Sequence, residues 1–436
     1  MASTAAPDRS FGNRGTLWSC VPVLFSDGLT VRDPESHFVG GTAITMRRFT
    51  SGAASIVVWG WDFNFPWARN FTRIRVVTLA RDGAPEENRR NDGTRVTDLS
   101  DVETWAAAPA SCVTPQGALA VLVRQGLNNP SFELFTISDV IQGNPVVTRH
   151  PINIAALFDS PLGTIRIAPD NADFGIVSSG GGRHLRVALL RAAGAIIQDI
   201  DLNGNPALPG LQGLDVASVR FNAGAATIAF TARLNHPGIG PTSIGAMLRL
   251  RADGTRDAAF GENGLWTSPL WLAYQPFICA GETSGIVAGC VKRRAVAFAP
   301  DATGTALEQS FGDAGIAEHD LSAPLESPVT ASDASGIYIF AQRAPTQADR
   351  AGDLRTAGCR FFNTWGAANY GQLDTGWGAG GTVTIGCDGA PVTPAALDLA
   401  PSEVYFVGTR ELEAVELSRI PVVVDLAKSN GDPNFS

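Results

Sequence analysis

Arginine recurs at corresponding points along the chain, each time where a short apolar stretch ends. A guanidinium presents its donors in a rigid fork that suits carboxylates and sulfates. If these side chains gather on one face, they form a candidate site for an anionic ligand. Pairing of each arginine with an Asp or Glu of a neighbouring repeat unit would instead give the set a structural role. The candidates are Arg124, Arg183, Arg233, Arg293, Arg343 and Arg410, with His184 directly after the second of them.

A dense group of aromatic residues forms the most unusual segment of the chain. Residues 59–71 read WGWDFNFPWARNF and include Trp61, Phe65 and Trp67. Aromatic rings around a loop suit stacking against a sugar or anchoring of a protein partner. The alternative is that alternate rings pack along a strand and the loop folds over the edge of a sheet.

Six cysteines are spread along the chain without the close spacing of zinc or redox motifs. Cys279 and Cys290 are nearly equidistant from the turn GETSG of one expected hairpin, which suggests a cross-strand disulfide. Cys359 and Cys387 fall on adjacent expected strands, where a second disulfide is plausible. Buried free thiols are the alternative for both pairs. The five histidines are scattered as well, and we expect neither a metal site nor a cofactor.

Two short motifs match nucleotide or calcium sites only in part. GWGAGG at 376–381 has GxGxxG spacing, but it runs into the apolar stretch TVTIG where a dinucleotide site needs a helix. DIDLNGNP at 199–206 places Asp201, Asn203 and Asn205 at alternate positions, without the bidentate Glu of a calcium loop. We interpret both as turns. The sequence contains no GxSxG, HExxH or P-loop motif, and no catalytic residue is assigned.

The chain is built from an internal repeat. Ile56 and Val404 are equivalent positions six repeats apart, which gives a repeat of about 58 residues. Short apolar strands joined by such turns predict antiparallel hairpins, and a unit of this length holds about four strands. The repeated element is an apolar strand, a turn rich in Gly, Asp and Ser, and a second apolar strand, at 46–61, 111–124, 166–179, 220–233, 277–290, 329–342 and 397–410.

Seven such units predict an all-β fold, a seven-bladed β-propeller with four-stranded blades of about 60 residues. One such sheet cannot bury both faces alone, and closing the stack into a ring leaves only short edges exposed. Both ends of the chain lie in a Phe-Gly stretch, at 8–18 and 431–436. We therefore expect an N-terminal strand at about 8–25 to complete the last blade, within one domain of residues 1–436. An open solenoid is the alternative, but it would need polar caps, and none is evident.

A second repeated motif places Phe-Gly after a turn. Residues 249–254 (RLRADG), followed by Asp257, Phe260, Gly261 and Gly264, resemble the delta-60 repeat family, a propeller-like bacterial repeat. The resemblance implies a propeller, often in an exported bacterial protein, and it transfers no catalytic residue. We expect Phe260 to fill the gap between neighbouring blades. Further copies are EQSFGDAGI at 308–316 and, with Trp in place of Phe, LDTGWGAGGTV at 373–383.

Composition narrows the classes of function. A net charge of -9 argues against binding to nucleic-acid phosphates, and no apolar run is long enough to span a bilayer. We predict a non-catalytic binding or scaffolding propeller for another protein, a glycan or an anionic small ligand. Its expected location is extracellular or periplasmic, with the cytoplasm as the alternative. A lectin-like propeller that stacks sugar on Trp61 and Trp67, and a lyase or hydrolase with a central site, are the other candidate functions.

Overall fold

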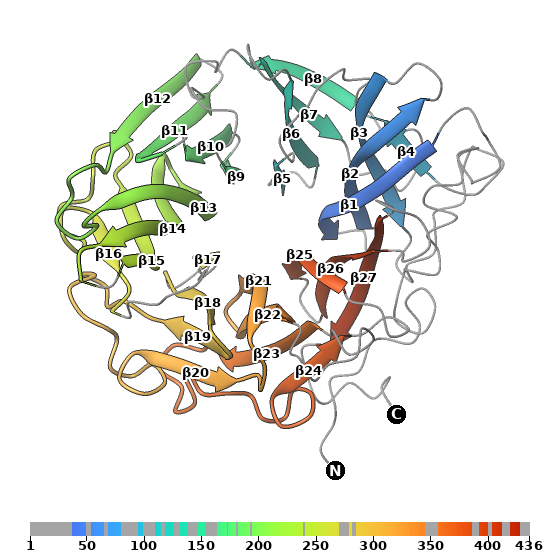
Figure 1. The fold of residues 1–436 in the computed structure, drawn as a ribbon. Coiled ribbons are helices and arrows are strands. Elements are labelled where there is room, and N and C mark those ends of the chain that lie inside the picture. The colour runs from blue at the N-terminus through green and yellow to red at the C-terminus, as the bar shows by residue number, and fades with distance from the viewer. Residues whose placement is uncertain are drawn as a thin grey trace.

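The computed structural model shows an all-β chain whose described residues form strands and no helix. These strands make seven antiparallel sheets, six of four strands and one of three. The sheets are arranged around a common centre, and the strands of each follow chain order from the centre outward (Figure 1). The structure describes residues 37–48, 54–64, 69–79, 95–98, 110–114, 118–125, 131–137, 147–152, 164–171, 173–179, 182–191, 194–238, 240–269, 279–280, 285–344, 356–385, 392–399, 403–411 and 419–427.

The first three sheets occupy the N-terminal half of the chain. The first contains β1 (His37–Arg48), β2 (Ala54–Asn64), β3 (Arg69–Leu79) and β4 (Arg95–Asp98). The second contains β5 (Ala110–Val113), β6 (Leu119–Gln125), β7 (Ser131–Ile137) and β8 (Val147–Ile152). The third contains β9 (Ile165–Asp170), β10 (Asp173–Ser179), β11 (His184–Arg191) and β12 (Gly194–Asp201).

Four further sheets complete the described structure. The fourth contains β13 (Leu211–Asn222), β14 (Ala225–His236), β15 (Gly240–Leu250) and β16 (Leu265–Thr267). The fifth contains β17 (Cys279–Ala280), β18 (Val287–Val291), β19 (Arg294–Phe298) and β20 (Ile316–Asp320). The sixth contains β21 (Leu325–Ser332), β22 (Gly336–Arg343), β23 (Thr356–Phe362) and β24 (Thr382–Ile385). The seventh contains β25 (Val392–Leu399), β26 (Glu403–Glu411) and β27 (Arg419–Ala427).

The repeated strand–turn–strand motif is the first hairpin of every sheet. In the first sheet Met46 pairs with Ile56, and in the seventh Leu399 pairs with Val404. The equivalent hairpins form in the five sheets between them. The predicted hairpins are therefore confirmed at all seven copies, with Ile56 and Val404 on the corresponding strands β2 and β26.

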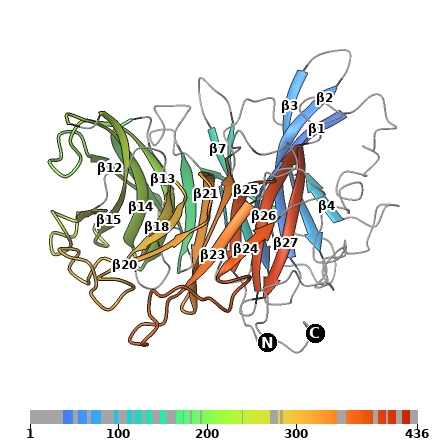
Figure 2. The same ribbon diagram turned by 60° about the horizontal axis from the view of Figure 1, so that its bottom comes forward.

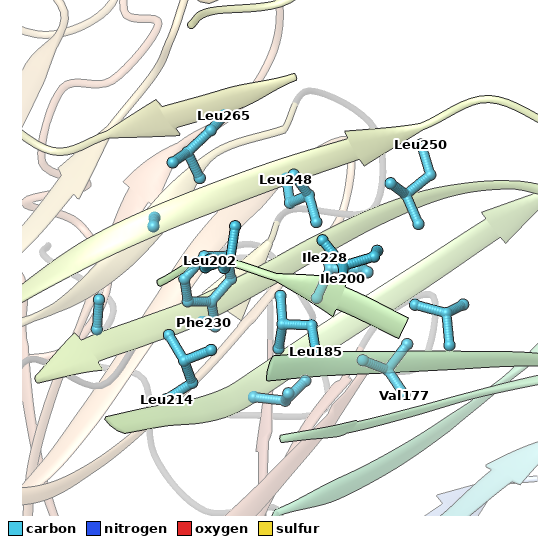
Figure 3. Packing of buried hydrophobic residues seen from close by; sticks show 14 of the residues in the cluster. Val177, Leu185, Ile200, Leu202, Leu214, Ile228, Phe230, Leu248, Leu250 and Leu265 are labelled. Carbon is cyan, nitrogen blue, oxygen red and sulfur yellow. The ribbon is translucent and has the colours of Figure 1, made fainter. Parts of the chain in front are cut away.

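Among the described side chains, the middle strands of the second to seventh sheets are apolar on both sides because neighbouring sheets cover them. In the cluster drawn in Figure 3, Val177 and Leu185 of the third sheet pack with Ile228, Phe230 and other residues of the fourth. Similar clusters join each described pair of consecutive sheets from the second to the seventh. Burial between sheets explains why the chain can be 44% hydrophobic with almost no large apolar side chain exposed among the described residues.

The Phe-Gly motif connects the third and fourth strands of a sheet. Phe260 is buried in a cluster that includes Met247 of its own sheet and Val287 of the next. Phe311 and Trp377 hold the same position between the fifth and sixth and between the sixth and seventh sheets. The expectation that Phe260 fills the gap between two sheets is confirmed. Trp377, which replaces Phe in its copy of the motif, fills the equivalent gap between the sixth and seventh sheets.

The first strands touch one another from sheet to sheet. Each of β1, β5, β9, β13, β17 and β21 contacts the first strand of the next sheet along the chain, and β25 contacts β1. The seventh sheet has three described strands. The strand expected at 8–25 lies outside the described residues and stays a prediction.

Candidate ligand-binding face

The ends of the sheets form two faces, which we call upper and lower. At the upper face the second strand of a sheet passes to the third, as in the β18–β19 turn. At the lower face lie the turns between first and second strands and the Phe-Gly connections between third and fourth strands. Figure 2 shows the sheets from the side, with the strands running between these faces.

The described arginines of the predicted set lie at the upper face, because they follow or end second strands. Arg124 lies on β6 and Arg410 on β26, both of them second strands of their sheets. The structure does not describe these two side chains. The others are Arg183, just before β11, whose first residue is His184, Arg233 near the end of β14, Arg293 in the β18–β19 turn, and Arg343 at the end of β22.

Arg233 forms an ion pair inside its own sheet. Its Nε lies 3.1 Å from Oδ2 of Asp215, and 59% of the arginine side chain stays exposed. Arg233 pairs across the strands with Gly213, where a Cβ would come within 2.7 Å of the guanidinium Nη2. The absence of a side chain at Gly213 thus lets the guanidinium cross β13 toward Asp215.

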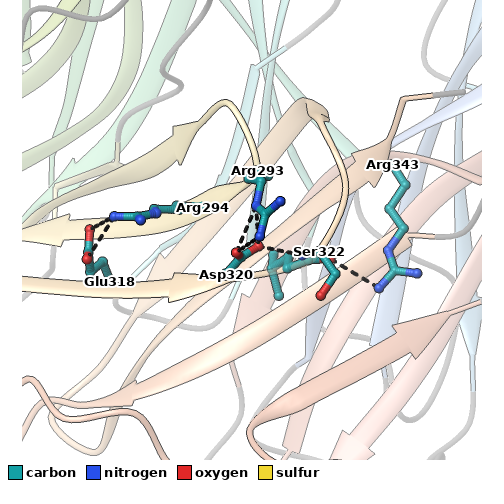
Figure 4. A network of polar contacts seen from close by, with 7 residues as sticks. Arg293, Arg294, Glu318, Asp320, Ser322 and Arg343 are labelled. Atoms are coloured by element: carbon teal, nitrogen blue, oxygen red, sulfur yellow. Dashed lines mark hydrogen bonds and ion pairs between the residues drawn. The ribbon is translucent and has the colours of Figure 1, made fainter. Parts of the chain in front are cut away.

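The fifth sheet holds two arginine–carboxylate pairs side by side (Figure 4). Arg293 donates from Nε and Nη2 to the carboxylate of Asp320, with Nε 2.8 Å from Oδ2. Arg294 donates from Nη1 to both carboxylate oxygens of Glu318 at 2.9 Å. The hydrogen bond from Arg293, helped by one from the Ser322 amide, lowers the pKa of Asp320 below its usual value. The same pairing raises the pKa of Arg293.

Arg343 lies beside this pair and joins two sheets. Its Nη2 donates to the carbonyl oxygen of Leu321 at 3.2 Å, in the segment between β20 and β21. Arg343 is half-buried and contacts backbone, whereas Arg293 is exposed and contacts a carboxylate. The two arginines therefore occupy one face with different local roles.

Arg183 and His184 contact polar residues around the end of β12. Arg183 Nη1 donates to Asn203 Oδ1 at 2.9 Å, and His184 Nδ1 lies 3.0 Å from Asp199 Oδ1. Asp201 Oδ1 accepts the Asn203 amide at 2.7 Å, which caps a turn. The oxygens of the partial calcium motif therefore bind an arginine and a backbone amide, as expected of a polar turn. Among the described residues, no group of three His, Cys, Asp or Glu could hold a metal ion.

The predicted disulfides are wrong. Cys290 and Cys359 are free and buried in the cluster between the fifth and sixth sheets. The strand register explains the first error, because Cys279 pairs with Ala288 and lies out of step with Cys290. Burial raises the pKa of the Cys290 thiol far above its usual value. Cys387 lies outside the described residues, but the free thiol of Cys359 excludes the second predicted bond.

The predicted aromatic segment includes the end of β2 at Asn64 and the start of β3 at Arg69, which lie at the same end of the sheets as the arginines. Trp61 falls on β2, where it pairs with Val39 and Thr72. Its side chain, together with Phe65 and Trp67, lies outside the described part of the structure. Sugar stacking or partner anchoring by these rings stays a prediction.

The sequence reasoning missed Trp365. Its indole is the exposed large hydrophobic side chain of the described residues, 66% open to solvent. It lies in the connection from β23 to β24, at the lower face. The sequence did carry one sign of this difference. The segment from the end of β23 to the buried Trp377 is longer than the equivalent segment from the end of β15 to Phe260.

Comparison with known proteins gives no family assignment. No family model matches the chain, and neither does any curated protein. An ulvan lyase structure, bound to an oligosaccharide of GlcA and Rha3S, has a TM-score of 0.45 at 9% identity, covering 90% of this chain and 96% of that one. Extracellular domains 1–2 of Drosophila semaphorin 1a give 0.44 at 9%, covering 92% and 89%. The WD40 domain of SCAP from fission yeast gives 0.30 at 10%, covering 92% and 76%.

The strand order and the contacts between sheets of the chain itself define its fold. The described residues also contain no helix of the length and apolar character needed to cross a membrane.

Proposed function

We propose that the chain is a single-domain, closed seven-bladed β-propeller that acts as a non-catalytic binding or scaffolding module. Contact of β25 with β1, in addition to contacts between the first strands of consecutive sheets, supports closure. Export from a bacterial cell and membership of the delta-60 repeat group are parts of the same proposal, supported by the Phe-Gly repeat alone.

The observation that carries the proposal is the pairing of charged side chains on the upper face. Arg233 with Asp215 and Arg293 with Asp320 form ion pairs of side chains that stay largely exposed. A guanidinium held by one carboxylate is already oriented and still presents other donors to a partner. Charges of both signs, fixed on several sheets, suit the complementary charges of a protein surface.

The same pairing makes Asp320 a poor candidate for a general base. A general acid or base works best when its pKa is close to the working pH. The pKa of Asp320 is lowered by Arg293, so this carboxylate stays ionised and is a weak base near neutrality. We propose that the ligand is another protein, bound and released without chemistry, because exposed charges of both signs suit a protein surface.

Site-specific photo-cross-linking in the native host tests this proposal. A photo-reactive residue is placed at exposed Asn235 or Ser322 on the upper face, or at exposed Glu262 on the lower face as control. We expect a discrete protein adduct from the two upper positions and not from Glu262. Combining the Asn235 probe with Arg293→Glu should reduce the adduct at least fivefold. Equal adducts from both faces, or no adduct from the upper positions, would overturn the proposal.

A further inference from the structure

Trp365 is an exposed indole held in a fixed position. Single exposed hydrophobic side chains are common on proteins, so exposure alone assigns no role. The Trp365 ring, however, lies edge-on to Tyr370, with 5.5 Å between centroids, and Tyr370 lies edge-on to Phe311 at 4.9 Å. Phe311 is fully buried between the fifth and sixth sheets. The exposed indole is thus continuous with the core through two aromatic contacts.

Hydrogen bonds also hold the backbone around Trp365 in place. The Ala367 amide donates to the Thr364 carbonyl at 3.2 Å, and the Tyr370 amide to the Ala367 carbonyl at 3.1 Å. The buried side chain of Asn363 donates to the carbonyl of Asp333, which ties the connection to the β21–β22 turn. A ligand that binds here pays little to order the protein, because the connection is ordered before it arrives.

There is open space beside Gly366, the residue after Trp365. Gly366 adopts a left-handed conformation with a φ of +76°, and a Cβ added there would meet nothing within 4 Å. Gly366 follows Trp365 directly, at the outer part of the connection. Gly366 has no side chain that could cover the indole, which is 66% exposed.

The chemistry of the connection favours a neutral, hydroxyl-rich ligand. Residues 363–373 read NTWGAANYGQL and contain no charged side chain. Exposed Thr364 and Gln372 and half-buried Asn369 supply neutral donors and acceptors. The nearby charges of Arg360 and Asp374 are buried and bonded to each other at 2.9 Å. The connection itself offers no counter-charge to an anionic ligand, whereas a sugar can offer C–H groups to the ring and hydroxyls to the amides.

We propose that the connection 363–373 is a binding site for a neutral saccharide, with one pyranose ring stacked on Trp365. The hydroxyl of Thr364 and the amides of Asn369 and Gln372 are the polar groups near enough in sequence to contact its hydroxyls. This lower-face site is separate from the protein-binding upper face of the proposed function, and either can fail without the other.

Isothermal titration with neutral hexasaccharides tests the site. Intact chain is titrated with cellohexaose, laminarihexaose, mannohexaose and maltohexaose. We expect at least one to bind, Trp365→Ala to weaken it at least tenfold, and Trp365→Phe to weaken it less. Exposed Arg251→Ala, also on the lower face, is the matched control and should bind like the unmodified chain. Thermal unfolding of Trp365→Ala should change only slightly, since the indole is 66% exposed and loses a single aromatic contact with Tyr370.

Three results would overturn the proposal. One is no binding of any hexasaccharide by the unmodified chain. The second is equal binding by the unmodified chain and Trp365→Ala. The third is a dimer, seen by analytical ultracentrifugation, that Trp365→Ala dissociates while sugar binding is absent, because the indole would then be a protein contact.

Discussion

Phe260 shows how one residue joins two sheets. Its ring packs between Met247 and Val287, and the Arg249 guanidinium lies 3.9 Å above it. We predict that Phe260→Ala lowers the free energy of unfolding by about 3–5 kcal/mol, because it opens a cavity in a closed inter-sheet core. Urea unfolding measures this loss. Glu262→Ala, at an exposed neighbour, should change stability little, and equal losses in both variants would contradict the prediction.

The buried thiols give a second prediction at the residue scale. Cys290 and Cys359 lie in one core cluster, and burial raises the pKa of both thiols, so almost no thiolate is present at neutral pH. We predict that iodoacetamide leaves both unmodified in the folded chain at pH 8 and alkylates both in 6 M guanidinium. Peptide mass spectrometry reads out the labelling. Rapid alkylation of Cys290 in the folded chain would show that the cluster opens readily.

At the scale of elements, the connection between β23 and β24 of the sixth sheet packs against Phe311 of the fifth sheet. Gly371 has a φ of +76°, and a Cβ there would come within 2.3 Å of the Gly312 amide nitrogen and 2.8 Å of the Phe311 ring. Gly366 has the same φ but open space around it. We predict a loss of about 1–2 kcal/mol for Gly366→Ala from backbone strain alone, and a clearly larger loss for Gly371→Ala.

The two variants are matched in backbone conformation and differ in packing, so urea unfolding of both isolates the contact between sheets. Equal losses would mean that the connection does not depend on its fit against Phe311.

His319 links two sheets and gives the stability a pH dependence. Its Nε2 lies 2.8 Å from the Thr382 hydroxyl on β24. Partial burial lowers the pKa of His319 below its ordinary value of 6.5, although Asp320 opposes the shift. The unfolded chain therefore takes up this proton more readily. The contribution present above pH 6.5 is lost as the pH falls from that value through the lower pKa of the folded state. Thermal unfolding from pH 8 to 5 should fall less steeply in His319→Gln, and parallel curves would contradict this.

The elements were largely predictable from sequence, and the contacts of the candidate site were not. Strand–turn–strand hairpins depend on local patterns, so all seven were found, and the Phe260 motif revealed its packing role through repetition. The predicted disulfide of Cys290 failed because a register offset of two residues is not encoded in the spacing from a turn. The partners of Arg233 and Arg293 are set by neighbouring strands, and Trp365 stands out only because the fold leaves it exposed.

For the whole molecule, the question is whether the sheets form a closed ring or an open stack. Both arrangements bury the clusters between consecutive sheets, so those clusters do not separate them. The contact of β25 with β1 supports the proposed closed ring, since such a ring requires it. In a closed propeller each sheet has two neighbours, and removing one exposes two apolar faces.

Deletion of residues 392–436, which include β25–β27, distinguishes a closed ring from an open stack. In an open stack the remaining sheets keep their contacts, and stability falls by the loss of one terminal unit. In a closed ring the deletion uncovers Tyr338, Phe340 and Trp377 on one side and removes the contacts of β1 on the other. We predict that the truncated chain loses its cooperative urea transition, measured by near-ultraviolet circular dichroism. A cooperative transition that is only moderately weakened would show that the sheets stack without closing.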